Sequence, residues 1–107
     1  MIKIAKYDII ETEVYSKWFA SLNDNKIKAR IGARINRVRL GNLGDTKSVG
    51  DKVFELKCQF GAGYRVYFTK QGKTIIILLC GGDKSTQEKD VKKAKQMVIE
   101  VINELKT

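Results

Sequence analysis

The sequence predicts a single α+β domain of the order β-α-α-β-β-β-α, in which an antiparallel sheet packs against a helical hairpin and a C-terminal helix. Three patterns in the spacing of apolar residues support this prediction: helical spacing over about residues 11–40, alternation from Val53 to Thr69 followed by a continuous apolar run at residues 74–80, and helical spacing again after Ser85. Because 107 residues are enough for one compact core and too few for two, residues 1–107 are expected to form one domain.

The N-terminal part of the chain is predicted to form a strand and two helices. Residues 2–9 begin with alternating apolar and polar residues, which indicates the strand. Four-residue spacing predicts a helix over residues 11–22, with an apolar face of Val14, Trp18 and Leu22. Residues 23–25 offer N-cap side chains for a second helix that ends near Leu40. Its predicted buried face carries Ile27, Ile31, Ile35 and Val38.

A β region and a last helix are predicted to follow a glycine-rich loop over residues 41–52. The predicted strands are residues 53–60, 64–69 and 74–80, separated by turns at Gly61-Ala62-Gly63 and Gln71-Gly72. The third strand is a continuous apolar run, which favours a central strand buried on both faces. Ser85-x-x-Glu88 has the spacing of a capping box and predicts the start of the last helix.

The turn at residues 61–63 predicts a strand register. If Phe60 faces Tyr64, the pairs across the hairpin are Gln59 with Arg65, Lys57 with Tyr67, and Glu55 with Thr69. These six side chains then share one face of the sheet, and the large apolar side chains lie on the other face. Lys84, just beyond the next strand, is expected to overhang the same polar face.

The charge balance favours a polyanionic partner. Twenty-one Lys and Arg against 12 Asp and Glu give a formal net charge of +9, which attracts phosphate backbones or an acidic protein. No acidic residue occurs between Asp24 and Asp45, and the second helix carries a basic stripe of Lys26, Arg30, Arg34 and Arg37. We interpret the stripe as an RNA-binding surface, and the alternative is an ordinary solvated helix face.

Several classes of site and location are disfavoured by what the sequence lacks. The chain has no histidine, so the usual zinc ligand and the usual general base are missing, and no metal or other cofactor is expected. Cys58 and Cys80 lie in apolar runs without a CxxC pair, which indicates buried reduced thiols. Neither a membrane span nor a signal peptide is recognisable, so we expect a cytoplasmic protein without a membrane partner.

The predicted polar sheet face has the groups that RNA cleavage needs. Attack of a ribose 2′-OH on its own phosphate requires a base, cations for the phosphate, and an acid for the leaving oxygen. Arg65 and Lys84 offer the charge, Glu55 or Lys57 offers the base, and Tyr67 or a lysine offers the acid. The alternative is a solvated sheet face in which glutamate and lysine are simple cross-strand neighbours.

Several segments together resemble the HigB-type addiction-module killer proteins of the RelE/ParE superfamily. The similar segments run in order from about residue 12 to residue 95. They are Trp18-x-x-x-Leu22, Gly41-Asn42-Leu43-Gly44-Asp45, Val53-x-Glu55-Leu56-Lys57, Gly61-x-Gly63-Tyr64-Arg65-Val66-Tyr67-Phe68 and Leu78-Leu79-Cys80-Gly81-Gly82-Asp83-Lys84-Ser85-x-Gln87.

The resemblance implies a RelE-like fold and the toxin half of a type II toxin–antitoxin system. It implies cleavage of mRNA in the ribosomal A site, and a cognate antitoxin, acidic or helix-turn-helix, that masks the basic surface. By position in the shared motifs, the resemblance implies that Lys57, Arg65 and Lys84 are the positively charged residues of the site. It makes Glu55 a candidate general base. Such toxins usually have a tyrosine or histidine near the C-terminus, but neither occurs here after Tyr67, and the corresponding region is residues 87–91. Two alternatives are a ParE-like inhibitor of DNA gyrase and an inactive basic RNA-binding relative.

Overall fold

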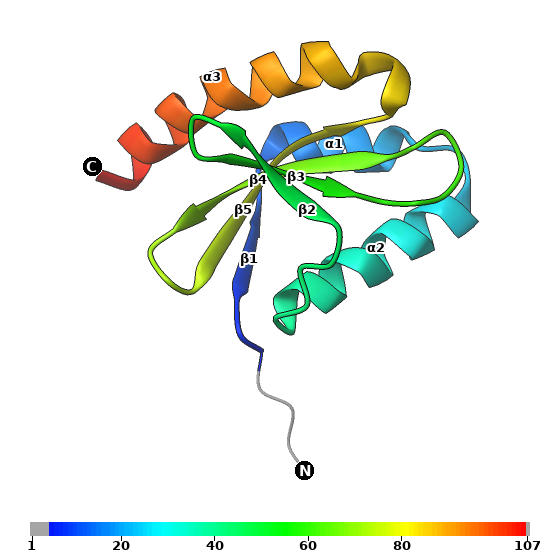
Figure 1. The fold of residues 1–107 in the computed structure, drawn as a ribbon, viewed down its shortest axis with the longest axis horizontal. Helices are drawn as coiled ribbons and strands as arrows, with labels where there is room; N and C mark the ends of the chain where they lie inside the picture. Colours follow the sequence, from blue (N-terminus) through cyan, green and yellow to red (C-terminus); the bar gives the residue numbers. More distant parts are fainter. Residues whose placement is uncertain (1–4, 107) are drawn as a thin grey trace.

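The computed structural model describes residues 5–106 and has the predicted α+β architecture. Three antiparallel strands of the C-terminal half, the helical hairpin and the C-terminal helix are all present (Figure 1). The elements are β1 (Asp8–Glu11), α1 (Glu13–Ser21), α2 (Asn25–Arg39), β2 (Thr46–Gly50), β3 (Val53–Lys57), β4 (Arg65–Gln71), β5 (Ile75–Gly82), a 3₁₀ turn (Lys84–Thr86) and α3 (Gln87–Lys106).

The helices form two layers around a five-stranded sheet of the order β1-β5-β4-β3-β2. On one face, Tyr15 of α1 and Ile31 and Val38 of α2 pack with the apolar side chains of the strands. On the other face, α3 packs Ala94 and Val98 against the sheet, and Figure 1 shows this helix on the side away from α2. β5 lies between β1 and β4 and is buried from Ile76 to Gly82, which confirms the predicted two-sided burial.

The first strand differs from the prediction in position and direction. Residues 2–4 lie outside the described residues, residues 5–7 are not in a strand, and β1 begins only at Asp8. β1 pairs with β5 in parallel, so the sheet is mixed and the prediction of a purely antiparallel sheet was wrong. Parallel pairing needs a long crossover connection, which the helical hairpin and the intervening strands provide.

A fifth strand, β2, occupies part of the predicted loop over residues 41–52. β2 pairs antiparallel with β3, and Lys47 lies opposite Glu55. The alternation did not indicate this strand because β2 is an edge strand whose residues are exposed or half-buried. The β2–β3 turn contains Asp51 and Lys52, both with positive φ (52° and 64°), as in the tight hairpin turns that match the twist of a sheet.

The predicted register of β3 and β4 was wrong by two residues. Lys57 lies opposite Arg65 and Glu55 lies opposite Tyr67. The connection is longer than a three-residue turn, since the Cys58 N–H donates to the Tyr64 carbonyl at 2.9 Å and closes a loop between the strands. A slip of two residues leaves each strand side chain on its predicted face but changes its partner across the hairpin.

The last helix begins with a different cap from the one predicted. Asp83, and not Ser85, is the capping residue: its carboxylate accepts from the Ser85 N–H at 2.8 Å, and its own N–H donates to the Thr86 hydroxyl at 3.3 Å. The cap therefore precedes a 3₁₀ turn that contains Lys84, and α3 continues from Gln87. No helix within residues 5–106 is both long enough and apolar enough to cross a membrane.

Both cysteines are buried and reduced, as predicted. Burial, followed by the nearby Asp90 carboxylate, raises the pKa of the Cys80 thiol to about 12. Burial also raises the pKa of the Cys58 thiol. Because the thiolate is the reactive form, neither side chain is an activated nucleophile at neutral pH.

Candidate functional site

A buried carboxylate lies where β3, β4 and the start of α3 meet. Glu55 is only 2% exposed, and its Oε2 accepts a hydrogen bond from the Tyr67 hydroxyl at 3.3 Å and another from the Gln87 side-chain amide at 2.9 Å. Tyr67 faces it from the neighbouring strand, and Gln87 reaches it from the first turn of α3. Three elements therefore fix the orientation of one carboxylate.

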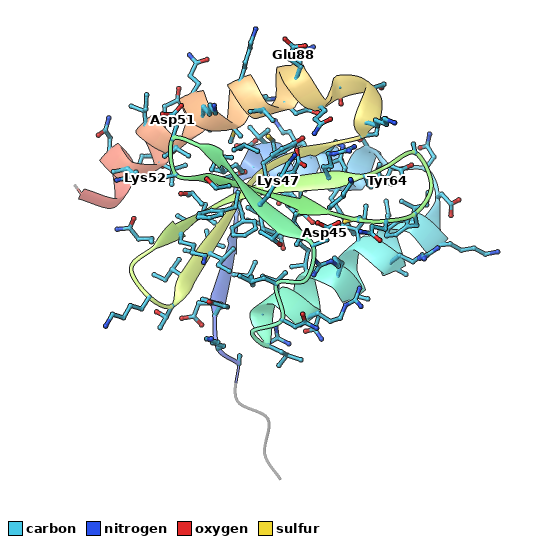
Figure 2. All side chains as sticks on the ribbon, viewed as in Figure 1. Asp45, Lys47, Asp51, Lys52, Tyr64 and Glu88 are labelled. Atoms are coloured by element: carbon cyan, nitrogen blue, oxygen red, sulfur yellow. The ribbon has the colours of Figure 1, made fainter. Side chains whose placement is uncertain are left out.

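Two cations flank the other oxygen of this carboxylate. The Glu55 Oε1 atom lies 3.6 Å from Arg65 Nε and 3.8 Å from Lys47 Nζ. The Lys47 side chain is 66% exposed and lies on the outer strand of the sheet, where Figure 2 labels it. The exposed positive charge of Lys47 therefore lies on the Oε1 side of the Glu55 carboxylate.

Arg65 is 5% exposed and holds one donor without an acceptor. Its Nη1 donates to the Gly63 carbonyl at 2.8 Å, whereas its Nε has no hydrogen-bond partner although it is buried. Buried donors in proteins are nearly always satisfied, and a guanidinium binds phosphate oxygens well. A small shift of this side chain toward an anion would give the Nε its missing acceptor.

Tyr67 has no exposed surface, which limits what its hydroxyl can do. Burial is the main reason that its pKa lies well above the ordinary value of 10.0, and the charge of Glu55 raises the pKa further. A phenol that is both inaccessible and a weak acid is poorly suited to give a proton to a substrate. Its hydrogen bond to Glu55 helps to fix the orientation of that carboxylate.

Lys57 and Lys84, the remaining predicted catalytic residues, are exposed and border this cluster. Lys57 is the register partner of Arg65. The Lys84 N–H donates to the Ala62 carbonyl at 3.2 Å. Both Lys84 and Arg65 lie close to Gly63: a Cβ atom at that glycine would be 3.2 Å from Lys84 Cβ and 3.4 Å from Arg65 Nη1.

Sequence reasoning missed two members of the cluster, Lys47 and Gln87. Lys47 was missed because residues 41–52 were predicted as a loop, and β2 shows no alternation of apolar and polar residues that could have indicated a strand. Gln87 belongs to one of the segments that carry the family resemblance and begins the region that replaces a C-terminal aromatic residue, but the sequence assigns it no role. Its role depends on how α3 is placed over β3, which no local pattern reports.

The basic stripe of α2 lines a cleft on the opposite side of β3 from α3. The cleft has a volume of about 300 Å³ and lies between α2, the loop that precedes β2 and the segment that follows β3. Its lining includes Arg30, Arg34, Arg37, Lys57 and the single acid Asp45. The Arg30 guanidinium lies 4.3 Å from the centre of the Phe60 ring, a cation–π contact. Lys26 does not line the cleft.

Arg34 differs from the rest of the stripe because it points inward. It is buried, and its Nη2 donates to the Leu43 carbonyl, which ties the loop after α2 to the helix. Loss of water around the guanidinium is the main cause of the lowered pKa of Arg34. Lys26, Arg30 and Arg37 of the predicted basic stripe are therefore exposed, whereas Arg34 is buried. Within residues 5–106, no group of three or more acidic or cysteine side chains is placed to hold a metal ion.

Comparisons with known proteins agree with this architecture. Residues 17–106 match the family described as phage derived protein Gp49-like (DUF891). An uncharacterized protein of Haemophilus influenzae (strain Rd) is 50% identical over 90 residues, which cover 84% of this chain and 91% of that protein. The solved structure of an E. coli toxin RelE mutant in the free state superposes with a TM-score of 0.67 at 16% identity, covering 87% of this chain and 98% of that one. The predicted RelE-like fold is thereby confirmed.

The burial of Tyr67 predicts an alkaline loss of stability. Above pH 10 the unfolded tyrosine ionises while the folded one keeps its proton, so the free energy of unfolding falls as the pH rises, by about 1.4 kcal/mol per pH unit for one such group. Tyr67→Phe should make this fall shallower by that amount. Urea unfolding between pH 9 and 11 measures it.

Tyr67→Phe should also lower the free energy of unfolding at neutral pH by about 1–3 kcal/mol, because Glu55 loses a hydrogen-bond donor. The test is therefore the slope of this free energy against pH. Tyr15→Phe is a matched variant, since burial also raises the pKa of Tyr15, and it should relieve the alkaline loss similarly. If Tyr67→Phe followed the parental slope, Tyr67 would be ionising in the folded protein.

Proposed function

The chain belongs to the Gp49-like family, and from this membership, its RelE fold and the cluster around Glu55 we propose that it is the toxin of a HigB-type type II toxin–antitoxin system. We propose further that it inhibits translation by cleaving mRNA on the ribosome. The observation that supports the activity best is the Glu55 carboxylate, fixed by two hydrogen bonds and flanked by Arg65 and Lys47.

The proposed reaction is transesterification within the RNA. Glu55 accepts the proton of a ribose 2′-OH, the 2′ oxygen attacks the adjacent phosphorus, and the bond from phosphorus to the 5′ oxygen breaks. The products are a 2′,3′-cyclic phosphate and a 5′-OH. Arg65 and Lys84 stabilise the additional negative charge on the phosphate in the transition state, and Arg65 can do so only if its side chain moves outward, because its Nε is buried 3.6 Å from the Glu55 Oε1.

The acid that protonates the leaving 5′ oxygen is proposed to be a lysine. Lys57, Lys84 and Lys47 are all exposed beside the cluster, whereas the Tyr67 hydroxyl is buried. Lys57 is also the second candidate for the base. Tyr67 is assigned to hold the Glu55 carboxylate in place, which is the role that its position supports.

The basic cleft is proposed to hold the RNA away from the reacting atoms. Lys26, Arg30 and Arg37 offer exposed charge to phosphates, and Arg34 keeps the cleft wall in place through Leu43. Lys57 lines the cleft and lies opposite Arg65, so one path of positive charge runs from the cleft to the reaction site. The proposed partners are mRNA, the ribosome and a cognate antitoxin, acidic or helix-turn-helix, that covers this charge in the cytoplasm.

A second candidate function is that of an inactive basic RNA-binding relative. Gln87 donates to Glu55 in the region where such toxins usually have a tyrosine or histidine. A carboxylate engaged by both Gln87 and Tyr67 has fewer lone pairs left to accept a proton. In that case the cluster would serve only to join α3 to the sheet.

The catalytic proposal predicts the behaviour of three variants in mRNA cleavage on purified ribosomes. Arg65→Ala should lower the rate about 100- to 1000-fold, because a preorganised donor to the transition state is lost. Arg65→Lys should recover only part of the rate, since a point charge cannot reproduce the planar fork. Glu55→Gln, which keeps the shape, should abolish the dependence of the rate on base ionisation. Lys73→Ala, at an exposed turn, is the control.

Because Arg65 is buried, each variant must first be shown to unfold cooperatively. A folded Arg65→Ala protein that cuts at the parental rate would remove this sheet face as the active site. No cleavage by the parental chain, with RNA binding intact, would favour the inactive relative, and gyrase-dependent DNA breaks in the cell would favour a ParE-like toxin.

The cleft proposal predicts a change in salt dependence. Replacing Arg30 and Arg37 together by alanine should weaken ribosome binding and reduce the magnitude of the salt slope by about 1.4 to 1.8, since two phosphate contacts are lost. Arg34→Ala should act differently and lower the stability of the fold, because it leaves the Leu43 carbonyl without its donor. An unchanged slope for the double variant would show that these arginines are only solvated.

A further inference from the structure

Four of the 12 acidic residues of this basic protein line one groove away from the Glu55 cluster. The groove has a volume of about 510 Å³ and lies between β1, the start of α1 and the C-terminal half of α3. β1 and β2 are opposite edges of the sheet, so the groove and the Lys47 side of the cluster lie at opposite ends of the strand order. The groove is lined by four glutamates and by no lysine or arginine: Glu11, Glu13, Glu100 and Glu104.

The interior of the groove is apolar. Ile77 of β5 forms part of the wall, and Val14, Met97 and Val101 are half-buried around it. Ile10 of β1 is 43% exposed, which makes it one of the few large apolar side chains so exposed within the described residues. An apolar interior with a charged border is the arrangement of a binding surface for an amphipathic partner.

The groove also borders an unpaired strand edge. β1 is the last strand of the sheet and pairs only with β5 among the strands of residues 5–106. Three of its four residues are exposed. An open strand edge beside an apolar groove is the geometry in which an extended peptide adds a strand and places alternate side chains in the groove.

The glutamates of the groove favour a positively charged peptide. They come from β1, α1 and two turns of α3, and within the described residues no three acids are grouped to hold a metal ion, so a row of separate cations fits them better than one ion. Lys17 Nζ lies 2.9 Å from Glu13 Oε1 and offsets the charge of that carboxylate, whereas charges at the other edge of the sheet are screened beyond about 8 Å at physiological salt. Glu11 and Glu100 therefore contribute the negative potential that an incoming cation meets in the groove.

We propose that this groove binds an extended segment of a partner protein in which apolar residues alternate with lysine or arginine. The apolar side chains occupy the groove over Ile10 and Val101, the cations lie against Glu11 and Glu100, and the backbone pairs with β1. A partner held there leaves the Glu55 cluster and the basic cleft uncovered. This interaction goes beyond the proposed RNA cleavage and does not depend on it.

The test uses a fluorescent peptide of alternating lysine and leucine, with a glutamate and leucine peptide as the reverse-charge control. The chain should bind the lysine peptide in spite of its own charge of +9, and should not bind the glutamate peptide at this site. Glu100→Lys should weaken binding about tenfold, because an attraction becomes a repulsion. Glu88→Lys makes the same charge change on the same helix, away from the groove, and should have little effect (Figure 2).

An apolar pair of variants separates docking in the groove from simple charge attraction. Ile10→Ser should weaken binding by about three- to tenfold, whereas Ile99→Ser, at an exposed position outside this groove, should not. Equal binding by all four variants would overturn the proposal. So would a dimer in sedimentation experiments that Ile10→Ser dissociates, since the occupant would then be a second copy. None of the four variants touches Glu55 or Arg65, so mRNA cleavage reports on the proposed function separately.

Discussion

The burial of the Glu55 carboxylate is the constraint on which the arrangement around the site depends. An ionised group with 2% exposure is costly unless its oxygens are satisfied, and here a phenol from β4 and an amide from α3 donate to one oxygen while two cations lie near the other. The start of α3 supplies Gln87, the register of β3 with β4 supplies Tyr67 and Arg65, and the position of β2 supplies Lys47. A shift in any of the three would leave a charge or a donor without its partner.

The same constraint explains why the site lies where it does along the sheet. Toward Val53 and Thr69 the face is covered by α3 and belongs to the core. Toward Lys57 and Arg65 the helix begins and the cover ends, so the polar side chains of the face are near solvent only there. Two layers of helices thus leave one end of one sheet face uncovered and place the cationic cleft of α2 on the other side of β3.

The sequence predicts the sheet face that carries the site, and there are physical reasons why it does not predict the strand register, β2 or the contact of Gln87. Alternation identified the face that holds Glu55, Arg65 and Tyr67 because side-chain direction repeats every two residues whatever the register. The register itself depends on the loop over residues 58–64, whose hydrogen bonds are not encoded in a pattern. β2 was missed because an edge strand buries too little to require alternation, and Gln87 because its contact with Glu55 joins positions 32 apart.

We propose that this chain cleaves RNA through the ribose 2′-OH at the Glu55 cluster. The most direct measurement uses purified ribosomes that carry either an all-RNA message or the same message with 2′-deoxyribose at each nucleotide of the A-site codon. We predict that the all-RNA message is cut in that codon to leave a 2′,3′-cyclic phosphate, and that the substituted message stays intact there because the nucleophile is missing. Cleavage of both messages within the codon, or of neither, would exclude this mechanism.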